Sequence, residues 1–266
     1  MTNPEAVAPQ VDARTAELAT NLAALLQRVD TACLAAGRKP DSVRLLPVTK
    51  FFPVEDVAIL YRLGRREFGE SREQEATAKV AALPTLVGQP HLVGQSTESD
   101  EDLPDVQWHM IGRLQRNKAR VVARWAHAVH SVDSERLATA LGGGARAALD
   151  AGERTDPVRV LLQVSLDEDP SRGGVAPDEL ARLAEHVAGS QGLRLSGLMA
   201  IPPLGAESDA AFARLATLHT MLLAEHPGAT ELSAGMSGDL ETAIEHGSTC
   251  VRVGTALMGA RPITSA

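Results

Sequence analysis

The sequence contains little cysteine, little lysine and few aromatic residues, and it has no long apolar run. With only two cysteines in 266 residues, the chain has no disulfide framework. Both of them, Cys33 and Cys250, lie in apolar segments, which is typical of reduced core residues in a cytoplasmic protein. No segment approaches the ~18 consecutive apolar residues of a membrane helix. The N-terminal segment MTNPEAVAPQVDARTAEL lacks the basic and apolar regions of a secretory signal. We therefore expect a cytoplasmic protein that does not bind membranes.

The sequence also has fewer basic than acidic residues. The chain has 34 acidic and 26 basic residues, which gives a formal net charge of −8. Such a surface repels phosphodiester backbones, so we expect no nucleic-acid partner. Only four of the basic residues are lysines, at positions 39, 50, 79 and 118, and Tyr61 is the single tyrosine. The chain therefore offers few choices for a reactive amine or a phenol.

The sequence does contain a regular alternation of strand and helix patterns. Its 44% of hydrophobic and 23% of charged residues are typical of a globular protein. An amphipathic helix is predicted over 12–36, followed by eight strands with seven helices between them. The predicted strands are 44–49, 66–69, 107–112, 127–132, 158–165, 193–201, 230–234 and 249–253. The predicted helices between them are 54–63, 71–82, 114–124, 134–151, 176–190, 207–225 and 238–246.

This alternation predicts a parallel sheet with right-handed crossovers. Eight such units form a single α/β domain, a (β/α)8 TIM barrel, with the N-terminal helix taking the place after the eighth strand. The alternative, an open doubly wound sheet, is disfavoured by the strand count and by the absence of GxGxxG after the first strand. We assign 12–262 to the barrel and 1–11 to a disordered tail. The acidic segment 88–105 interrupts the pattern; we favour a surface insertion there over a lid.

Functional residues of such barrels lie at the C-terminal ends of the strands, and Lys50 ends the segment LLPVTK. The other lysines lie in a turn (Lys39), within a helix (Lys79) and at a helix start (Lys118), where we expect them to be solvated. A lysine removed from water can act as an amine nucleophile and form a Schiff base. From position alone, an ordinary surface lysine at a strand end is an equally good interpretation of Lys50.

Small residues follow the last two predicted strands. Ser233 and Ser237 lie in the segment SAGMSG at the end of the seventh, and Gly254 and Thr255 follow the eighth. Small residues let the backbone approach a ligand, and a helix start offers free N–H groups to an anion. Phosphate sites of these barrels are frequently built from the same two loops. The alternative is ordinary turn and capping chemistry.

Arg252 lies inside the apolar strand CVRVG, so it needs solvent, a barrel carboxylate or a ligand as its partner. His127 and His130 form the segment HAVH. Residues three apart on a strand point to opposite faces, so we expect no shared ion and no metal site. GxSxG is absent and so is SxxK around Lys50, which leaves serine-hydrolase chemistry without support.

Segments along the whole chain resemble those of the pyridoxal phosphate homeostasis proteins. In order, they are LLPVTKFFP, EFGESREQEA, WHMIGRLQRNK, VHSVDS, LLQVSLDEDPSRGG, GLMAIPP and LSAGMSGDLETAIEHGSTCVRVGTALMGAR. The resemblance extends from about residue 12 to residue 261. It implies a fold-type III barrel like that of alanine racemase, without the second β domain of that enzyme. It also implies pyridoxal 5′-phosphate (PLP) as the cofactor.

The resemblance implies roles for nine residues. Lys50 matches the lysine that forms the imine with the cofactor, and Arg252 matches the arginine that faces the pyridine nitrogen. The matches to the phosphate-binding positions are Ser233, Gly254 and Thr255, with Ser237 as a further candidate. The matches to other positions near the cofactor are Ser71, His109 and Met199, and the family usually has Asn in place of Ser71.

The function implied by the resemblance is intracellular PLP homeostasis, with indirect effects on amino- and keto-acid metabolism. An arginine at the ring nitrogen disfavours a protonated pyridinium, so the ring is a poorer electron sink. Racemisation also needs an acid or base on each face of the substrate, and Tyr61 lies away from the expected site. We expect a monomeric carrier that passes PLP to apo-enzymes and is not an efficient catalyst. The alternatives are a weak amino-acid racemase and, more distantly, a phosphosugar enzyme acting through Lys50.

Overall fold

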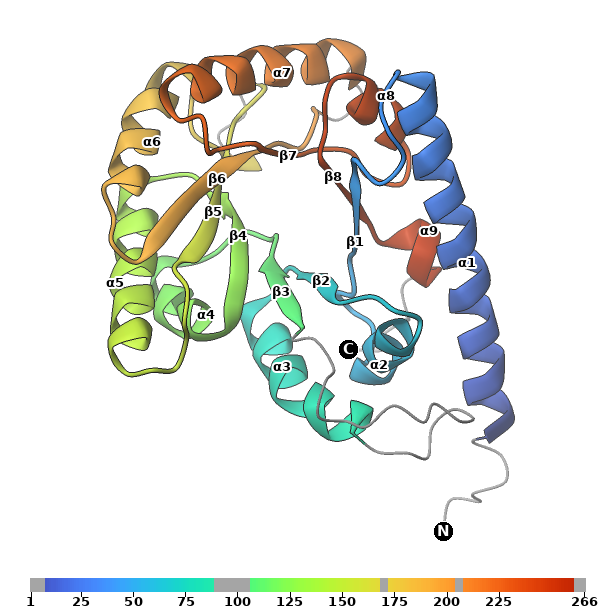
Figure 1. The fold of residues 1–266 in the computed structure, drawn as a ribbon. Coiled ribbons are helices and arrows are strands. Elements are labelled where there is room, and N and C mark those ends of the chain that lie inside the picture. The colour runs from blue at the N-terminus through green and yellow to red at the C-terminus, as the bar shows by residue number, and fades with distance from the viewer. Residues whose placement is uncertain (1–7, 89–105, 168–171, 204–207, 261–266) are drawn as a thin grey trace.

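The computed structural model describes residues 8–88, 106–167, 172–203 and 208–260 (Figure 1). Its strands are β1 (Arg44–Pro47), β2 (Glu67–Glu70), β3 (Gln107–Met110), β4 (Ala126–Val132), β5 (Val158–Gln163), β6 (Leu193–Met199), β7 (Glu231–Ser233) and β8 (Cys250–Val253). The α-helices are α1 (Ala8–Ala35), α2 (Val54–Arg62), α3 (Glu73–Val87), α4 (Ala119–Trp125), α5 (Glu135–Asp150), α6 (Leu180–Ala188), α7 (Ser208–Glu225), α8 (Leu240–Glu245) and α9 (Thr255–Met258). Two 3-10 helices precede α4 and α6: η3 (Arg116–Lys118) and η5 (Pro177–Glu179).

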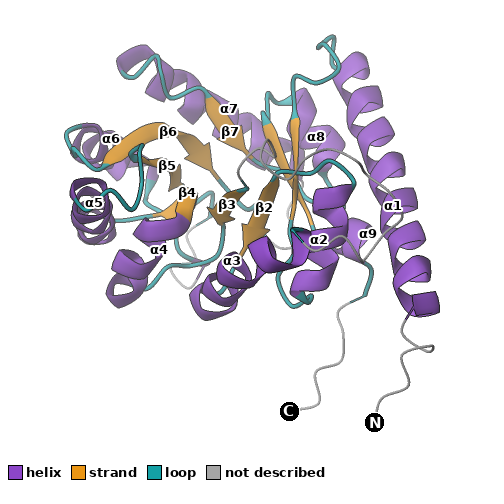
Figure 2. Cartoon of the chain, turned by 60° about the horizontal axis from the view of Figure 1, so that its bottom comes forward, coloured by secondary structure: helices purple, strands orange, loops and turns teal. Residues whose placement is uncertain are grey.

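The eight strands are parallel and follow the order β1-β8-β7-β6-β5-β4-β3-β2. Beyond β1, a parallel bridge joins Val48 to Gly69 of β2, and the Thr49 N–H donates to the Gly69 carbonyl at 3.0 Å. The two edges of the sheet therefore meet, and the strands form a nearly closed barrel inside a ring of helices (Figure 2). The predicted TIM barrel is confirmed.

The apolar side chains of the strands are buried because the helices cover the outer face of the sheet and side chains fill its interior. In β5, with the sequence VRVLLQ, the side chains of Val158, Val160, Leu161 and Leu162 are fully buried. Each such side chain stabilises the fold by roughly 1.5–3 kcal/mol. The polar residues that follow the strands lie outside this core, at one end of the barrel.

The N-terminal helix α1 packs along one side of the barrel, against α8, α9 and α2 (Figure 1). Its buried stripe consists of Leu18, Leu22, Leu25 and Val29, none of them more than 5% exposed. Their spacing of three and four residues is the pattern from which the helix was predicted. The helix closes the ring next to β8, as expected, but it shares that place with the short helix α9, which the pattern did not predict.

The predicted N-terminal tail differs from the structure in its boundary, and the predicted acidic insertion lies almost wholly outside the described residues. Helix α1 begins at Ala8, so residues 8–11, which we had assigned to the tail, are helical. Residues 1–7 and 89–105, the second being nearly the whole acidic segment, lie outside the described residues. Within the described ranges, no helix is both long and apolar enough to cross a membrane.

Candidate functional site

A cavity of about 560 Å³ lies at the C-terminal ends of the strands. Six residues predicted from the sequence line it, namely Lys50, Ser71, Ser237, Arg252, Gly254 and Thr255. They follow or end β1, β2, β7 and β8, which the closed sheet places next to one another. A volume of this size lies within the range of roughly 300–1,000 Å³ that is usual for small-molecule sites.

The described lining of the cavity is positively charged although the chain as a whole is negative. Its described lining residues include Lys50, Arg113, Arg172 and Arg252 but no aspartate or glutamate. Arg172 is partly neutralised, because its Nη1 lies 2.8 Å from Asp167 Oδ2. The chain carries a formal net charge of −8, so this concentration of cations is local. A cavity of this charge is suited to an anionic ligand.

Hydrogen-bond donors are concentrated where β7 and β8 end. The Ala256 N–H donates to Ser237 Oγ at 3.3 Å, which fixes this hydroxyl beside the first turn of α9. Gly254 precedes this turn as its capping residue. The first N–H groups of a helix have no acceptor within the helix, and together with the nearby hydroxyl they can surround an anion.

Arg252 lies at the inner end of the cavity and is only 5% exposed. Its Nη1 donates to Ser233 Oγ at 2.7 Å, and its Nη2 donates to the Ala200 carbonyl at 3.0 Å. Burial lowers the pKa of this guanidinium. No carboxylate among the described residues forms an ion pair with Arg252, which favours a ligand over a barrel carboxylate as its remaining partner.

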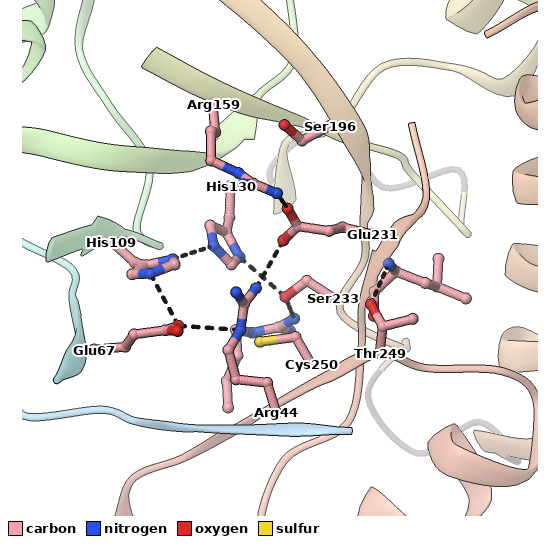
Figure 3. Close-up of polar contacts among 12 residues, drawn as sticks. Arg44, Glu67, His109, His130, Arg159, Ser196, Glu231, Ser233, Thr249 and Cys250 are labelled. Carbon is pink, nitrogen blue, oxygen red and sulfur yellow. Dashed lines mark hydrogen bonds and ion pairs between the residues drawn. The ribbon is translucent and has the colours of Figure 1, made fainter. Parts of the chain in front are cut away.

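Ser233 accepts from Arg252, and a series of hydrogen bonds continues from Ser233 into the barrel interior, where Figure 3 labels Ser233, His130 and His109. Ser233 Oγ is 3.0 Å from His130 Nδ1, and His130 Nε2 is 2.9 Å from His109 Nδ1. An arginine can only donate, so Ser233 Oγ accepts from Arg252, and its hydroxyl proton is available to His130 Nδ1. When that hydroxyl donates to Nδ1, a neutral His130 carries its proton on Nε2, where it faces His109 Nδ1. Burial lowers the pKa of His130 and of His109, which agrees with neutral rings.

This series of hydrogen bonds leads to a group of ion pairs among Glu67, Arg44, Glu231 and Arg159 (Figure 3). His109 Nε2 lies 3.3 Å from Glu67 Oε2, and Glu67 is paired with Arg44 at 3.1 Å. Arg44 Nη2 also lies 2.7 Å from Glu231, which is paired with Arg159 as well. These residues come from the N-terminal parts of β1, β2, β5 and β7. The interior is therefore polar along its length, from the cavity to the far end.

Three of the predicted site residues do not line the cavity. Ser233 is fully buried beneath Arg252, and His109 is one hydrogen bond further in. Met199, at the end of β6, pairs in register with Ser233 and is 1% exposed. Of the two serines proposed for an anion, the structure brings only Ser237 to the cavity.

The expectation that His127 and His130 point to opposite faces of their strand is wrong. His127 and His130 both lie beside His109, with ring centroids 5.6 and 5.1 Å from it. The register between β3 and β4 shifts between Trp108 and His109, so that β4 uses one more residue than β3 over this stretch. Such an irregularity changes which face successive side chains occupy. Even so, the described residues contain no group of three or more potential metal ligands.

The expectation of a solvated Lys79 is also wrong. Lys79 is 6% exposed and forms ion pairs with Glu70 at 2.8 Å and with Glu75 at 2.9 Å. The sequence contained a signal for this, because Lys79 lies three residues after Ala76 and four before Leu83, on the buried face of α3. That spacing identifies the buried face of α3. It does not identify Glu70, the carboxylate that pairs with the buried lysine, because Glu70 lies on β2.

Other lining residues were missed by sequence reasoning. Arg113 and Arg172 lie in the loops after β3 and β5, and Phe51 directly follows Lys50. The two arginines belong to the segments IGRLQ and PSRGG at strand ends, a position that could have identified them. Among 22 arginines, however, this signal is not specific.

Comparisons with known proteins agree with this geometry. The profile of the family described as "Alanine racemase, N-terminal domain" matches residues 20–262. A protein of Mycobacterium tuberculosis named "Pyridoxal phosphate homeostasis protein" is 53% identical over 255 residues, which are 95% of this chain and 96% of the relative. An Escherichia coli protein of the same name is 36% identical over 248 residues, covering 92% and 97%. The structure of PipY from Synechococcus elongatus with PLP bound matches with a TM-score of 0.72 and 36% identity, over 91% of this chain and 100% of that one.

Proposed function

Because the chain belongs to the alanine racemase N-terminal domain family and, within it, to the pyridoxal phosphate homeostasis proteins, we propose that it binds PLP in the cavity at the strand ends. Its role is to buffer this cofactor and deliver it to other proteins. The observation that carries the proposal is the composition of the cavity: a lysine, a buried arginine and a helix start in one site without a described carboxylate. The relatives' names and the PLP-bound PipY structure support the same ligand.

The residues of the cavity fit the parts of PLP. Ser237, Gly254 and Thr255 would hold the phosphate, whose negative charge suits the start of α9. Arg252 would donate a hydrogen bond to the pyridine nitrogen, which is an acceptor while it is unprotonated. Lys50 supplies the primary amine. When PLP is bound, its aldehyde condenses reversibly with a primary amine and releases water.

The same residues favour a carrier over an enzyme. Arg252 is a donor and forms no ion pair with a described carboxylate, so it holds the ring nitrogen in its unprotonated, weakly electron-withdrawing form. Tyr61 is 6% exposed on α2, and its ring lies against Arg66 at 4.0 Å, away from the cavity lining. Lys50 can move a proton on one face of a substrate, and no tyrosine among the described lining residues serves the other. A weak amino-acid racemase remains the second candidate on account of Lys50.

The proposed setting is the cytoplasm, with apo-forms of PLP enzymes as recipients and a monomer as the working unit. Both cysteines are buried and unpaired, which suits a reducing compartment. Size-exclusion chromatography with light scattering tests the monomer.

The first test concerns Lys50. We expect the protein with PLP to show a yellow absorption band that borohydride removes while fixing the ligand to Lys50, and we expect Lys50→Ala to lose both. Lys50→Arg is a matched control that keeps the charge without a reactive primary amine, and it should also lose both. Peptide mapping of the reduced adduct to Lys39, Lys79 or Lys118 would disprove the assignment.

The second test separates carrier from enzyme. The PLP-loaded protein is incubated with L-amino acids while chirality is followed, and is separately mixed with an apo-enzyme that requires PLP. We expect no turnover near the roughly 1 per second of an ordinary enzyme, and faster reactivation of the apo-enzyme than with free PLP. Rapid racemisation would overturn the carrier role. Reactivation no faster than with free PLP would overturn delivery and leave storage.

A further inference from the structure

A buried ionic cluster lies directly behind Lys50. It consists of Glu70 at the end of β2 and of Glu75 and Lys79 on α3. Glu70 and Lys79 are 0% and 6% exposed, and Glu75 is half-buried. None of the three lines the cavity, and the proposed binding of PLP does not use them directly. A buried ion pair contributes little net stability on average, so its retention calls for a local reason.

Lys79 is fully engaged as a donor. Its Nζ lies 2.8 Å from Glu70 Oε1, 2.9 Å from Glu75 Oε1 and 2.9 Å from the carbonyl oxygen of Thr49. These three acceptors match the three N–H groups of an ammonium. Lys79 is therefore fixed in direction and has no lone pair for chemistry of its own. One of its three bonds reaches the backbone of the residue just before Lys50.

The two carboxylates of the cluster also accept hydrogen bonds from the Thr49–Phe51 turn. Glu75 Oε1 accepts the Phe51 N–H at 2.7 Å, and Glu70 Oε1 accepts the Thr49 hydroxyl at 2.7 Å. The cluster thus binds the peptide groups before and after Lys50, with Thr49 itself fully buried. Lys50 is the residue between the two fixed points.

The turn held in this way has an unfavourable backbone conformation. Phe51 has φ of 70°, in the left-handed region that residues other than glycine rarely adopt. Such a conformation persists only where surrounding contacts determine it, and it is frequently found at functional sites. The contacts that determine it here include the bonds from Glu75 and Lys79.

We propose that Glu70, Glu75 and Lys79 are positioning residues that hold the Thr49–Phe51 turn so that the Lys50 amine is directed into the cavity. The inference rests on the proposed function, since Lys50 needs this direction only if it meets an aldehyde there. The cluster acts through the backbone and contacts no part of the ligand. Its contribution is to the bond between the Lys50 amine and the aldehyde carbon, not to the recognition of the phosphate or the ring.

Two ligands separate this role from a general effect on folding. PLP carries an aldehyde that can bond to Lys50, whereas pyridoxine 5′-phosphate has an alcohol at the same carbon and cannot. A positioning role predicts selective weakening of PLP, because misplacing a reacting group by about 1 Å can reduce its effectiveness by up to about a hundredfold. A merely structural role predicts equal weakening of both ligands.

The main variant is Glu75→Ala, which removes the acceptor of the Phe51 N–H at a half-buried position where the fold should survive. We expect its dissociation constant for PLP to rise about tenfold or more, with less than a twofold change for pyridoxine 5′-phosphate and an unchanged melting temperature without ligand. Glu75→Gln, which keeps an acceptor oxygen, should stay close to the original protein. Equal losses for both ligands, or no loss of PLP binding, would overturn the proposal.

Phe51→Gly, alone and combined with Glu75→Ala, tests the role of the turn itself. Phe51→Gly removes the penalty of the left-handed turn, so combining it with Glu75→Ala should restore part of the lost selectivity for PLP over pyridoxine 5′-phosphate. No restoration in a folded double variant would contradict the role of the turn. If the original protein forms no borohydride-fixed adduct on Lys50, the proposed function fails first, and that result is separate from any result on the cluster.

Discussion

Ser233 and Ser237 are four residues apart, yet the structure gives them different neighbours. Ser237 lies at the cavity beside α9, whereas Ser233 lies beneath Arg252 and bonds to His130. The Ser233 hydroxyl accepts from the charged Arg252 and lies within hydrogen-bond distance of His130, so both of these contacts are to buried protein groups. Under the proposed function, Ser237 would bind the phosphate and Ser233 would support the arginine that is proposed to meet the ring.

This difference predicts opposite patterns for two alanine variants. Ser237→Ala should weaken PLP by about 1.5–3 kcal/mol, the usual contribution of a hydrogen bond to a charged group, and should change the affinity for unphosphorylated pyridoxal little. Ser233→Ala should weaken both ligands to a similar extent, because Arg252 loses an acceptor and contacts the ring that both share. Isothermal titration of the two ligands provides the measurement. A phosphate-specific loss in Ser233→Ala would restore the role first assigned to that residue.

Helix α1 supports, from outside the barrel, the end of the cavity that is proposed to hold the phosphate. Arg28 Nη1 donates to the Ser237 carbonyl at 2.9 Å, while Asn21 and Arg14 donate to the carbonyls of Leu257 and Met258, each at 3.0 Å. The last carbonyl groups of a helix have no partner within it, so these bonds complete α9. The N-terminal helix is therefore part of the structure that fixes the cavity.

At the level of this helix, we predict that Arg28→Ala loosens the turn at Ser237. One hydrogen bond contributes about 0.5–1.5 kcal/mol, so the affinity for PLP should fall roughly two- to tenfold, with a smaller change for unphosphorylated pyridoxal. Gln27→Ala, at an exposed neighbouring position on the same helix, is the matched control. If Arg28→Ala and Gln27→Ala bind PLP equally well, α1 has no part in holding the phosphate end.

The elements were predictable to the extent that their patterns are long and local. All eight strands were predicted, because alternating apolar segments and helical periods repeat along the chain. Helix α9 was missed because its four residues are too few to show a period. The choice between Ser233 and Ser237 depends on where β7 ends and its turn begins, and residue type does not reveal this. The partners of Lys79 could not be predicted, because Glu70 and the Thr49 carbonyl reach it only through the packing of α3 on the barrel.

The whole molecule should lose stability as the pH falls from 7 to 5. His109 and His130 are buried, and burial lowers their pKa values from 6.5. The pKa of His127 falls to about 4, chiefly through burial. Below 6.5 the unfolded chain therefore takes up protons that the folded protein does not. The free energy of unfolding then decreases by up to about 1.4 kcal/mol per pH unit for each histidine that stays neutral.

Urea unfolding at pH 7, 6 and 5 measures this dependence. His130→Gln should reduce the slope, whereas His186→Gln, at an exposed position on α6, should not. Burial raises the pKa of Glu70, so this residue makes the free energy of unfolding increase as the pH falls. Its contribution is the same in both histidine variants and cancels when their slopes are compared. An unchanged slope in His130→Gln would mean that the interior histidines are not held neutral.

The pairing of β1 with β8 brings together residues that lie far apart along the chain. Leu46 lies in register with Arg252, and Val48 donates its N–H to the Val253 carbonyl at 2.9 Å. On the ribosome, Lys50 is made long before its neighbours Gly254 and Thr255. A nascent chain that has not reached β8 has no complete cavity, and a fragment released at that stage carries Lys50 without the groups proposed to hold a phosphate beside it. Assembly of the proposed site therefore waits until β8 has been made and has paired with β1.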